Sequence, residues 1–373
     1  MQAKVNTSVL EKVLKKIEGV ADKKASMAVL SMVLVEPDPE EGTIHFTATD
    51  LETGYKAKVP AELEGDAIPF CVPARKFYEI VKNFPEEEIL FIKDENRLIV
   101  KDAEERIIYN LATTESEDFP SLPEFSEENA IEIQGKTLEE LISNTIFCTS
   151  KEESHFVLGG IFFEPLKDEG KLRAVASDGH RLVKLDREIP GIEEADLQEG
   201  FIVARKAAKQ MEDIAGDELV VKLGYTNNYV VLWTPNAIFF TRTIEGTFPD
   251  YRSVIPQSYD NTLKVDRKLL ISALKRVSLV IPEKFKPVTF ELKPDEIVLT
   301  SQETEMGKAQ IKLSAIYEGT PLTVNYNAQY LLDALEIMKS EEVEIKIGEE
   351  RTPALLTGYR DEGFLYLVMP MVL

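Results

Sequence analysis

The sequence predicts an α+β fold built from three similar domains, and three observations support this prediction. An apolar helix pattern at Val9-Leu10 returns at Leu138 and at Leu269-Leu270, about 130 positions later each time. The segment Ala74-Arg75-Lys76 likewise returns at Ala204-Arg205-Lys206. A period of this length matches a whole domain, because solenoid repeats span only about 20–50 residues. Finally, strand-like segments follow one another within each repeat, without the strict alternation with helices that marks a parallel α/β sheet.

The composition is that of an ordinary globular chain. Its 373 residues are 44% hydrophobic and 29% charged, and a chain of this length is expected to form domains of roughly 100–200 residues. No apolar run approaches the roughly 20 residues of a membrane helix, and the N-terminal segment lacks an apolar signal region. We therefore expect a cytoplasmic protein that does not associate with membranes. The spacing of Cys71 and Cys148 favours neither a metal site nor a disulfide framework.

The first predicted domain spans residues 1–123. A strand at 3–6 leads into a helix, whose start is marked by the capping box Ser8-x-x-Glu11. A second helix begins near Pro73, a residue suited to the first helical turn. The segment 119–123, which contains two prolines, is expected to be a linker. The other predicted strands span residues 29–35, 43–48, 55–59, 89–92, 98–101 and 107–112.

The second and third predicted domains span residues 128–254 and 257–373. Thr137 and Glu140 form a second capping box, and Asp266 is the expected N-cap of the first helix in the third domain. The segment Phe248-Pro249-Asp250-Tyr251 ends the second domain, as Phe119-Pro120 ends the first. We expect two helices and about six to eight strands in each domain.

Positive charge gathers on the helix faces that lie opposite the apolar stripes. The net charge of −23 argues against nucleic-acid binding by charge alone, but the distribution of charge decides what a surface can attract. Basic residues on these faces could contact phosphates without reading base sequence. These residues include Lys12, Lys15, Arg75, Lys76, Arg205, Lys206 and Lys275.

A plainer interpretation remains open for these basic residues. Lys and Arg are good helix formers and are common on solvated faces. The first helix of the second domain also departs from the pattern, because it exposes Glu139 and Glu140. The basic faces are therefore a tendency of the chain, and DNA bound by them would have to be held by geometry.

The search for catalytic chemistry finds one candidate, the stretch Asp178-Gly179-His180-Arg181. An Asp–His pair could act as a general base, yet the chain shows no nucleophile elbow, P-loop or dinucleotide fingerprint. The corresponding place in the first domain, Thr49-Asp50-Leu51-Glu52, also carries an acidic residue in a tight turn. We therefore expect a structural turn, no enzymatic activity, no metal and no cofactor. The apolar C-terminus, residues 365–373, is either a packed final strand or the lining of a groove.

Taken in order, these motifs resemble the bacterial sliding clamp family, the beta subunit of DNA polymerase III. The resemblance covers the whole chain. It implies three DNA-clamp domains per chain, with helices lining a central hole and antiparallel sheets outside, and a head-to-tail homodimer that closes a ring around duplex DNA. The implied function is a processivity factor that tethers the replicative polymerase. The motifs are Thr49-Asp50-Leu51-Glu52, Val72-Pro73-Ala74-Arg75-Lys76-Phe77, Ser177-Asp178-Gly179-His180-Arg181-Leu182, Phe248-Pro249-Asp250-Tyr251-Arg252 and Val368-Met369-Pro370-Met371.

The resemblance also implies a pocket between the second and third domains that accepts short linear motifs with Gln, Leu and Phe anchors. Its implied partners are the DNA polymerase III alpha subunit, the clamp loader complex, other polymerases, mismatch repair proteins and ligase. Lys24 and Lys151 are added to the candidate contacts with double-stranded DNA, which are not sequence-specific. The implied pocket residues are Leu158, Ser177, Gly179, His180, Arg181, Leu182, Pro249, Val254, Leu367, Met369, Pro370 and Met371.

Three residues depart from the family pattern and leave details of DNA and partner contact open. Glu152 stands where a neutral residue is common, His155 where arginine is common, and Val372 where a basic residue is frequent. Two other hypotheses about the function remain open. One is a peptide-binding hub without a DNA role, favoured by the acidic charge and the apolar tail, and the other is a hydrolase that uses Asp178 and His180.

Overall fold

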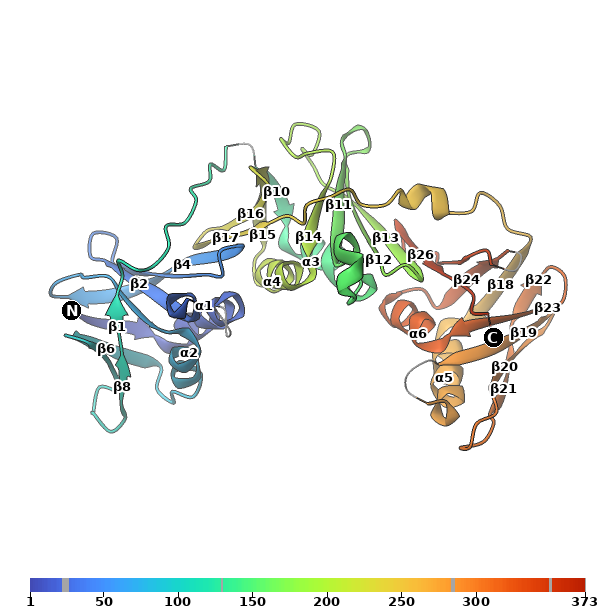
Figure 1. Cartoon of the computed structure of the whole chain (residues 1–373), viewed down its shortest axis with the longest axis horizontal. Helices are drawn as coiled ribbons and strands as arrows, with labels where there is room; N and C mark the ends of the chain where they lie inside the picture. Colours follow the sequence, from blue (N-terminus) through green and yellow to red (C-terminus); the bar gives the residue numbers. More distant parts are fainter. Residues whose placement is uncertain (22–26, 129, 283–285, 349–350, 373) are drawn as a thin grey trace. The chain divides into compact units, whose positions relative to one another are not determined.

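The computed structural model spans the chain and describes all residues except 22–26, 129, 283–285, 349–350 and 373. The chain forms two compact units, and the middle repeat contributes to both. Figure 1 labels helices and strands along the chain. Unit 1 comprises Met1–Glu139, Glu194–Gln198 and Lys209–Thr243. Unit 2 comprises Glu140–Glu193, Glu199–Ala208 and Ile244–Leu373. Both units combine helices with antiparallel sheet, as the sequence predicts.

Unit 1 contains one 13-stranded sheet, whose main path runs β10-β15-β16-β17-β4-β1-β6-β7-β8. Strand β4 pairs with β17, with Thr53 opposite Thr241, so the sheet continues from the first repeat into the second. The strands are β1 Gln2–Asn6, β2 Met32–Asp38, β3 Thr43–Thr49, β4 Thr53–Glu64, β5 Phe70–Pro73, β6 Glu88–Asp94, β7 Arg97–Lys101, β8 Ile108–Ala112, β9 Thr114–Glu115, β10 Ile131–Gln134, β15 Val220–Thr226, β16 Tyr229–Thr234 and β17 Ala237–Arg242.

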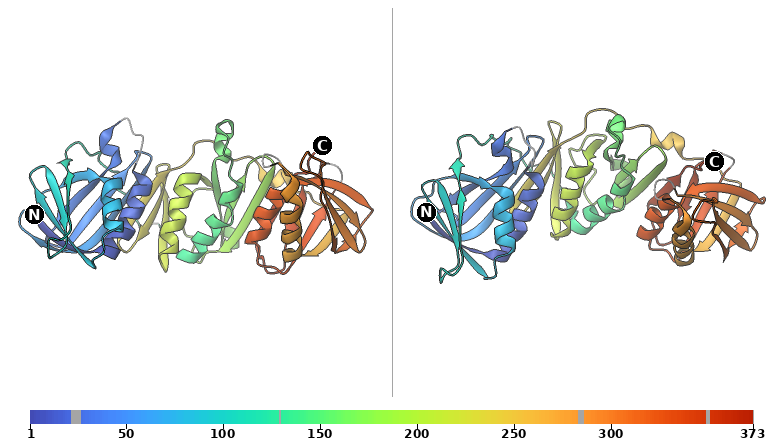
Figure 2. Two further views of the ribbon diagram at one scale, coloured as in Figure 1. Left: turned by 90° about the horizontal axis from the view of Figure 1, so that it is seen from below. Right: turned by 60° about the horizontal axis from the view of Figure 1, so that its bottom comes forward.

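Helices α1 (Thr7–Val20) and α2 (Ala74–Lys82) of unit 1 lie side by side against these strands (Figure 2). Leu10, Leu14 and Ile17 are fully buried, which matches the predicted apolar stripe. The predicted capping box at Ser8 is wrong, because the Asn6 side chain caps the helix by accepting a hydrogen bond from the Val9 amide. The Ser8 hydroxyl donates to the same Asn6 oxygen instead.

Unit 2 contains a nine-stranded sheet, β14-β11-β12-β13-β26-β25-β24-β18-β22, and a four-stranded sheet, β21-β20-β19-β23. Strand β13 pairs with β26, with Arg181 opposite Val368, so this sheet joins the second repeat to the third. The strands are β11 Gly160–Leu166, β12 Lys171–Ser177, β13 Arg181–Glu188, β14 Phe201–Ala204, β18 Asn261–Asp266, β19 Pro287–Lys293, β20 Glu296–Ser301, β21 Gln310–Ser314, β22 Ile316–Glu318, β23 Leu322–Asn327, β24 Glu342–Ile347, β25 Ala354–Thr357 and β26 Phe364–Val368.

The remaining helices belong to the second and third repeats. Helices α5 (Arg267–Val277) and α6 (Ala328–Ile337) of unit 2 pack together, and Asp266 caps α5 as predicted, by accepting from the Leu269 amide. Helices α3 (Gly135–Ser143) and α4 (Arg205–Gly216) each have residues in both units. Throughout the described part of the chain, no helix combines the length and the apolar character that crossing a membrane requires.

Candidate functional site

The turn between β12 and β13 in unit 2 is fixed by its own polar side chains. Asp178 Oδ1 accepts hydrogen bonds from the His180 amide at 3.0 Å and the Arg181 amide at 3.1 Å. Ser177 Oγ accepts from the Gly179 amide and donates to the Arg181 carbonyl. Gly179 has φ +88°, a conformation that favours glycine. The Asp178 carboxylate is therefore a turn-forming group, which counts against a general base built from Asp178 and His180.

The Arg181 side chain lines a pocket beside this turn, but its guanidinium is paired with carboxylates of the protein itself. Its Nε donates to Asp178 Oδ2 at 2.9 Å, and its Nη1 donates to Asp333 Oδ2 at 2.6 Å. Its Nη2 donates to the Phe147 carbonyl, and the guanidinium lies 4.3 Å from the ring centroid of Tyr330. Because only 9% of the side chain is exposed, Arg181 ties α6 to the turn and offers little positive charge to a ligand.

A largely apolar pocket of about 210 Å³ opens beside this turn. Its floor belongs to a buried cluster that includes Leu182, Phe248, Tyr251 and Leu367. Strand β26 contributes Leu367, and Met369 is placed at the pocket because its amide donates to the His180 carbonyl at 2.9 Å. The lining residues are Leu158, Ser177, Gly179, His180, Arg181, Leu182, Phe248, Pro249, Asp250, Tyr251, Val254, Pro353, Leu367 and Met369.

The structure thus brings together all but two of the pocket residues expected from the sequence. Pro370 and Met371 do not line it, because the Met371 amide donates to the Asn325 carbonyl at 2.8 Å and leads the chain towards β23. The expectation also missed four lining residues. Three of them, Phe248, Asp250 and Tyr251, flank Pro249 in the motif at residues 248–252, which could have indicated that they line the pocket. No sequence motif indicates the fourth, Pro353.

A polar network behind the pocket holds the ring of Tyr251 in place. The Tyr251 hydroxyl donates to Glu164 Oε2 at 2.5 Å and accepts from Arg173 Nη1 at 2.9 Å. Arg173 also makes paired bonds to Asp186 at 2.7 and 2.9 Å. Burial, followed by the hydrogen bond to Glu164, raises the pKa of Tyr251 to about 12. The phenol is therefore neutral at physiological pH, and its ring serves as an apolar wall.

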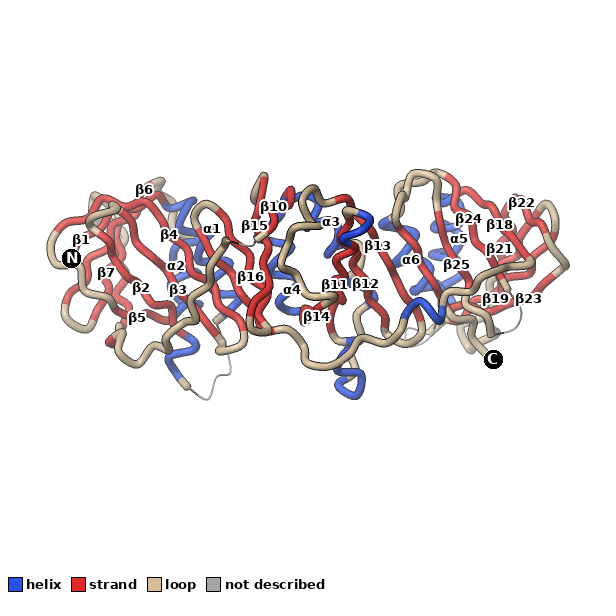
Figure 3. Tube along the Cα trace, turned by 90° about the horizontal axis from the view of Figure 1, so that it is seen from above, coloured by secondary structure: helices blue, strands red, loops and turns tan. Residues whose placement is uncertain are grey.

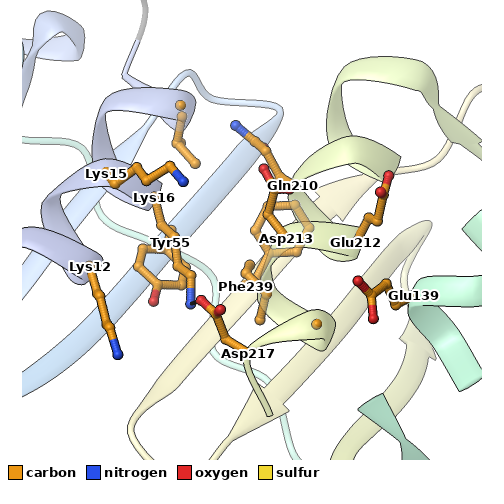
Figure 4. Close-up of a pocket in the computed structure, with 14 residues that line it drawn as sticks. Lys12, Lys15, Lys16, Tyr55, Glu139, Gln210, Glu212, Asp213, Asp217 and Phe239 are labelled. Atoms are coloured by element: carbon orange, nitrogen blue, oxygen red, sulfur yellow. Dashed lines mark ion pairs between the residues drawn. The ribbon is translucent and has the colours of Figure 1, made fainter. Parts of the chain in front are cut away.

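A second pocket, of about 400 Å³, lies in unit 1 beside α1 and has a mixed polar and apolar lining (Figure 4). Lys12, Lys15 and Lys16 of α1 line one side of it. Lys16 Nζ lies 2.8 Å from Asp217 Oδ2, and only 16% of the Lys16 side chain is exposed. Glu139, Glu212 and Asp213 also line the pocket. Carboxylates of the second repeat therefore partly neutralise the lysines of α1, and Lys12 and Lys15 remain exposed.

The other candidate DNA contacts lie in different environments. Arg75 and Lys76 are exposed and both pair with Glu79, and Lys275 pairs with Glu336 at 2.7 Å. Lys151 and Lys206 are exposed, and Lys24 lies outside the described residues.

Arg205 differs from these residues because its guanidinium is used inside unit 2. Its Nη1 donates to Thr149 Oγ1 at 2.9 Å and to the Ile146 carbonyl at 3.3 Å. The helical pattern predicts that Arg205 lies on a basic helix face. It does not predict these two partners, because they belong to a segment far away in the sequence. The Arg205 guanidinium is therefore engaged within the protein and is less suited than the exposed lysines to contact DNA.

Comparison with known proteins finds the same family along the whole chain. Three domain models of the DNA polymerase III beta subunit match: the N-terminal domain at residues 1–123, the central domain at 132–250 and the C-terminal domain at 252–372. The beta sliding clamp of Pseudomonas putida is 30% identical over 100% of both chains.

Solved structures agree with these sequence matches. The DNA polymerase III beta subunit of Thermotoga maritima matches with a TM-score of 0.92 and 27% identity, covering 100% of this chain and 99% of that one. A sliding clamp of Bartonella birtlesii bound to griselimycin matches with a TM-score of 0.92 and 28% identity over 100% of both chains. The expected fold of three clamp domains is thereby confirmed.

Proposed function

Because the chain belongs to the DNA polymerase III beta subunit family, the bacterial sliding clamps, we propose that it encircles duplex DNA and tethers the replicative polymerase. The observation that carries this proposal is the match of all three clamp domains over the full chain. Members of this family are processivity factors. We accordingly propose a cytoplasmic protein without catalytic activity, whose domains span residues 1–123, 128–254 and 257–373.

DNA is held in this proposal by enclosure, with weak phosphate contacts that do not read sequence. The chain carries a net charge of −23, so overall attraction to DNA is unfavourable. Exposed lysines on α1 can still offset the phosphate charge locally. Tethering raises the local concentration of a bound polymerase without requiring tight contact with DNA. The proposed contacts are Lys12, Lys15, Lys24, Arg75, Lys76, Lys151, Lys206 and Lys275.

We infer a head-to-tail homodimer from two sheet edges whose backbone groups are open to pairing with another chain. Strand β8 ends the main strand path of unit 1, and its Ile108 and Tyr109 are 50% and 41% exposed. In unit 2, β21 forms an edge of the four-stranded sheet, and its Ile311 is half-buried. Exposed edges of this kind are templates for pairing with another chain. Pairing β8 of one copy with β21 of another would give the unpaired backbone groups of both edges hydrogen-bond partners.

We infer that the apolar pocket of unit 2 docks short linear motifs of partner proteins. Its volume and apolar floor suit Leu and Phe anchors, and Met369 is an adaptable side chain at its mouth. The proposed partners are the DNA polymerase III alpha subunit, the clamp loader complex, other polymerases, mismatch repair proteins and ligase.

The test of enclosure compares circular with linear DNA. The protein is loaded onto nicked circles by a bacterial clamp loader, and its retention is measured by gel filtration before and after a restriction cut. We expect retention on circles and loss within minutes after linearisation. Equal loss from both forms would contradict enclosure and would favour the hub without a DNA role. Ile108→Asp is the matched variant, because it should give a monomer that is never retained.

A further inference from the structure

A cluster of side chains able to bind a metal lies on the β2–β3 hairpin of unit 1, outside the lining of both pockets described above. Asp38 ends β2, Glu41 lies in the turn, and His45 lies on β3, beside β2 in the sheet (Figure 3). One carboxylate oxygen of each acid and one ring nitrogen of His45 all lie within 4.8 Å of one another. The register pairs Asp38 with Thr43 and Glu36 with His45. Asp38 and His45 therefore share one face of the hairpin.

The hairpin backbone holds the Asp38 carboxylate in a defined orientation. Asp38 Oδ1 accepts hydrogen bonds from the amides of Glu40 at 3.0 Å and Glu41 at 3.1 Å. The second oxygen, Oδ2, is then the donor atom for a ligand, while Glu41 is exposed and can rotate towards it.

We propose that Asp38, Glu41 and His45 bind a divalent transition-metal ion, for which Zn²⁺ is the best match. An imidazole with two carboxylates suits Zn²⁺ better than Mg²⁺ or Ca²⁺, which prefer sites made of oxygen alone. Metal–ligand bonds of about 2.1 Å place tetrahedral donor atoms about 3.4 Å apart. Donor atoms within 4.8 Å of one another approach that spacing, and rotation of the exposed Glu41 side chain can bring its carboxylate closer. Water would fill the fourth position, as in other sites with three protein ligands.

An unpartnered hydroxyl on the same face supports this site. The Thr43 hydroxyl is buried, yet within the described part of the chain it has no hydrogen-bond partner. Thr43 lies opposite Asp38 and two residues before His45, so its side chain is on the proposed metal side. Buried hydroxyls in folded proteins normally find a partner. A metal-bound water is the kind of group that would provide one.

The charges around His45 come from both neighbouring strands. Burial, and then Lys56, lower its pKa, while Glu36, Asp38 and Glu41 act in the opposite direction. Lys58 lies opposite His45 on β4, and its ammonium is 3.7 Å from Glu41 Oε2. Lys58 thus competes with the metal for Glu41.

The test is calorimetric titration of Zn²⁺ into the full-length protein after treatment with a chelator, at pH 7.4. We expect one ion per chain, bound at least about tenfold more weakly by Glu41→Gln and by His45→Ala. Glu40→Gln is the matched control, because it removes the same charge from the same turn and should bind normally. Lys58→Met should bind Zn²⁺ severalfold more tightly. His155→Ala, which removes an exposed histidine elsewhere, should have no effect.

Two outcomes would overturn the proposal. Equal weakening by Glu41→Gln and Glu40→Gln would show diffuse attraction to an acidic surface, and absence of binding up to about 1 mM Zn²⁺ would exclude a site of useful affinity. Glu41 is an exposed turn residue, so its variant should fold even if His45→Ala does not. Circular dichroism checks both variants. Co²⁺ in place of Zn²⁺ should give visible absorption bands in the wild type that are lost in Glu41→Gln.

Discussion

The two junctions between repeats, β4–β17 in unit 1 and β13–β26 in unit 2, share a backbone plan but differ in their side chains. At the first junction Asp50 Oδ1 accepts from the amides of Glu52 and Thr53, as Asp178 does in the second. At each junction, a backbone hydrogen bond joins the turn to a residue at or just beyond the end of the neighbouring strand. The Arg242 amide donates to the Glu52 carbonyl at 2.8 Å, and the Met369 amide donates to the His180 carbonyl at 2.9 Å.

The side chains at equivalent places differ between the two junctions. Arg242 lies 3.5 Å from Glu52 and donates to the Tyr229 hydroxyl, where the second junction has Met369 and His180. Thr53, which bonds to Thr241 at 3.0 Å, stands in place of Arg181. The two turns therefore share one backbone scaffold and differ in a few side chains, and the apolar pocket of unit 2 lies beside the second.

The largest expected effect tests whether Arg181 carries more stability than its counterpart. Arg181→Met should lower the free energy of unfolding by about 3 kcal/mol, because it leaves two carboxylates, Asp178 and Asp333, without their buried partner. Thr53→Val at the equivalent place should cost only about 1 kcal/mol, for one hydroxyl hydrogen bond. Urea unfolding followed by circular dichroism measures both. Similar losses in the free energy of unfolding would show that the two positions contribute equally to stability.

Exchanging the residues that distinguish the junctions should affect peptide binding only at the second junction. Met369→Arg, which copies the first junction, should weaken binding of a peptide with Gln, Leu and Phe anchors by about 2 kcal/mol, or roughly 30-fold. The reciprocal Arg242→Met should leave peptide binding unchanged. Fluorescence anisotropy with a labelled peptide gives both affinities. Unaltered binding by Met369→Arg would place the peptide site elsewhere.

A partly buried ion pair near the second junction should give a pH-dependent contribution to stability that the first junction lacks. Hydrogen bonds from Arg187, and then Lys339, lower the pKa of Glu140 to about 2. The ionised carboxylate thus stabilises the fold fully above its unfolded pKa, near 4.5, and loses this contribution as pH falls towards 2. Glu140→Gln should be less stable at pH 7 by on the order of 1 kcal/mol.

Melting temperatures measured from pH 7 down to pH 3 test this prediction. The difference between the wild type and Glu140→Gln should shrink below about pH 5. Glu52→Gln is the control at the first junction, where the ion pair with Arg242 is exposed and should contribute little at any pH. A constant difference for Glu140→Gln across the range would contradict the assignment.

The smallest expected effect concerns the left-handed residue of each turn. Leu51 has φ +75° and Gly179 has φ +88°, a region in which side chains other than glycine are strained. Leu51→Gly should therefore stabilise by up to about 1 kcal/mol, and Gly179→Ala should destabilise by about 1 kcal/mol. A Cβ at Gly179 would meet no atom within 4 Å, so only backbone strain is tested. Thermal melting should show shifts of opposite sign.

The sequence predicted the repeats, the α+β class and most of the pocket, because these depend on local patterns that recur along the chain. Apolar periodicity located α1 and α5, and ordered motifs located the turn at Ser177 and the strand ending at Val368. Choices among competing partners were harder to predict. Asn6 outcompetes Ser8 as a cap, although both residue types suit that role.

Partners distant in the sequence were beyond local reasoning. The hydrogen bond from Arg205 to Thr149 and the ion pair between Lys16 and Asp217 depend on the packing of segments that lie far apart in the sequence. Pro353 reaches the pocket for the same reason. A helical period shows which side of a helix faces out, but it does not show which neighbouring group will meet a side chain there.

The strand ladders at the two junctions also determine how the chain responds to mechanical load. In each, five consecutive residue pairs link neighbouring repeats, Thr53–Ala57 with Ala237–Thr241 and Arg181–Leu185 with Phe364–Val368. Tension applied along these strands loads the amide bonds in parallel, so they must rupture together rather than one after another. An advancing polymerase that pulls on either junction would therefore meet a shear-resistant seam, and single-molecule pulling should register those seams as the high-force events.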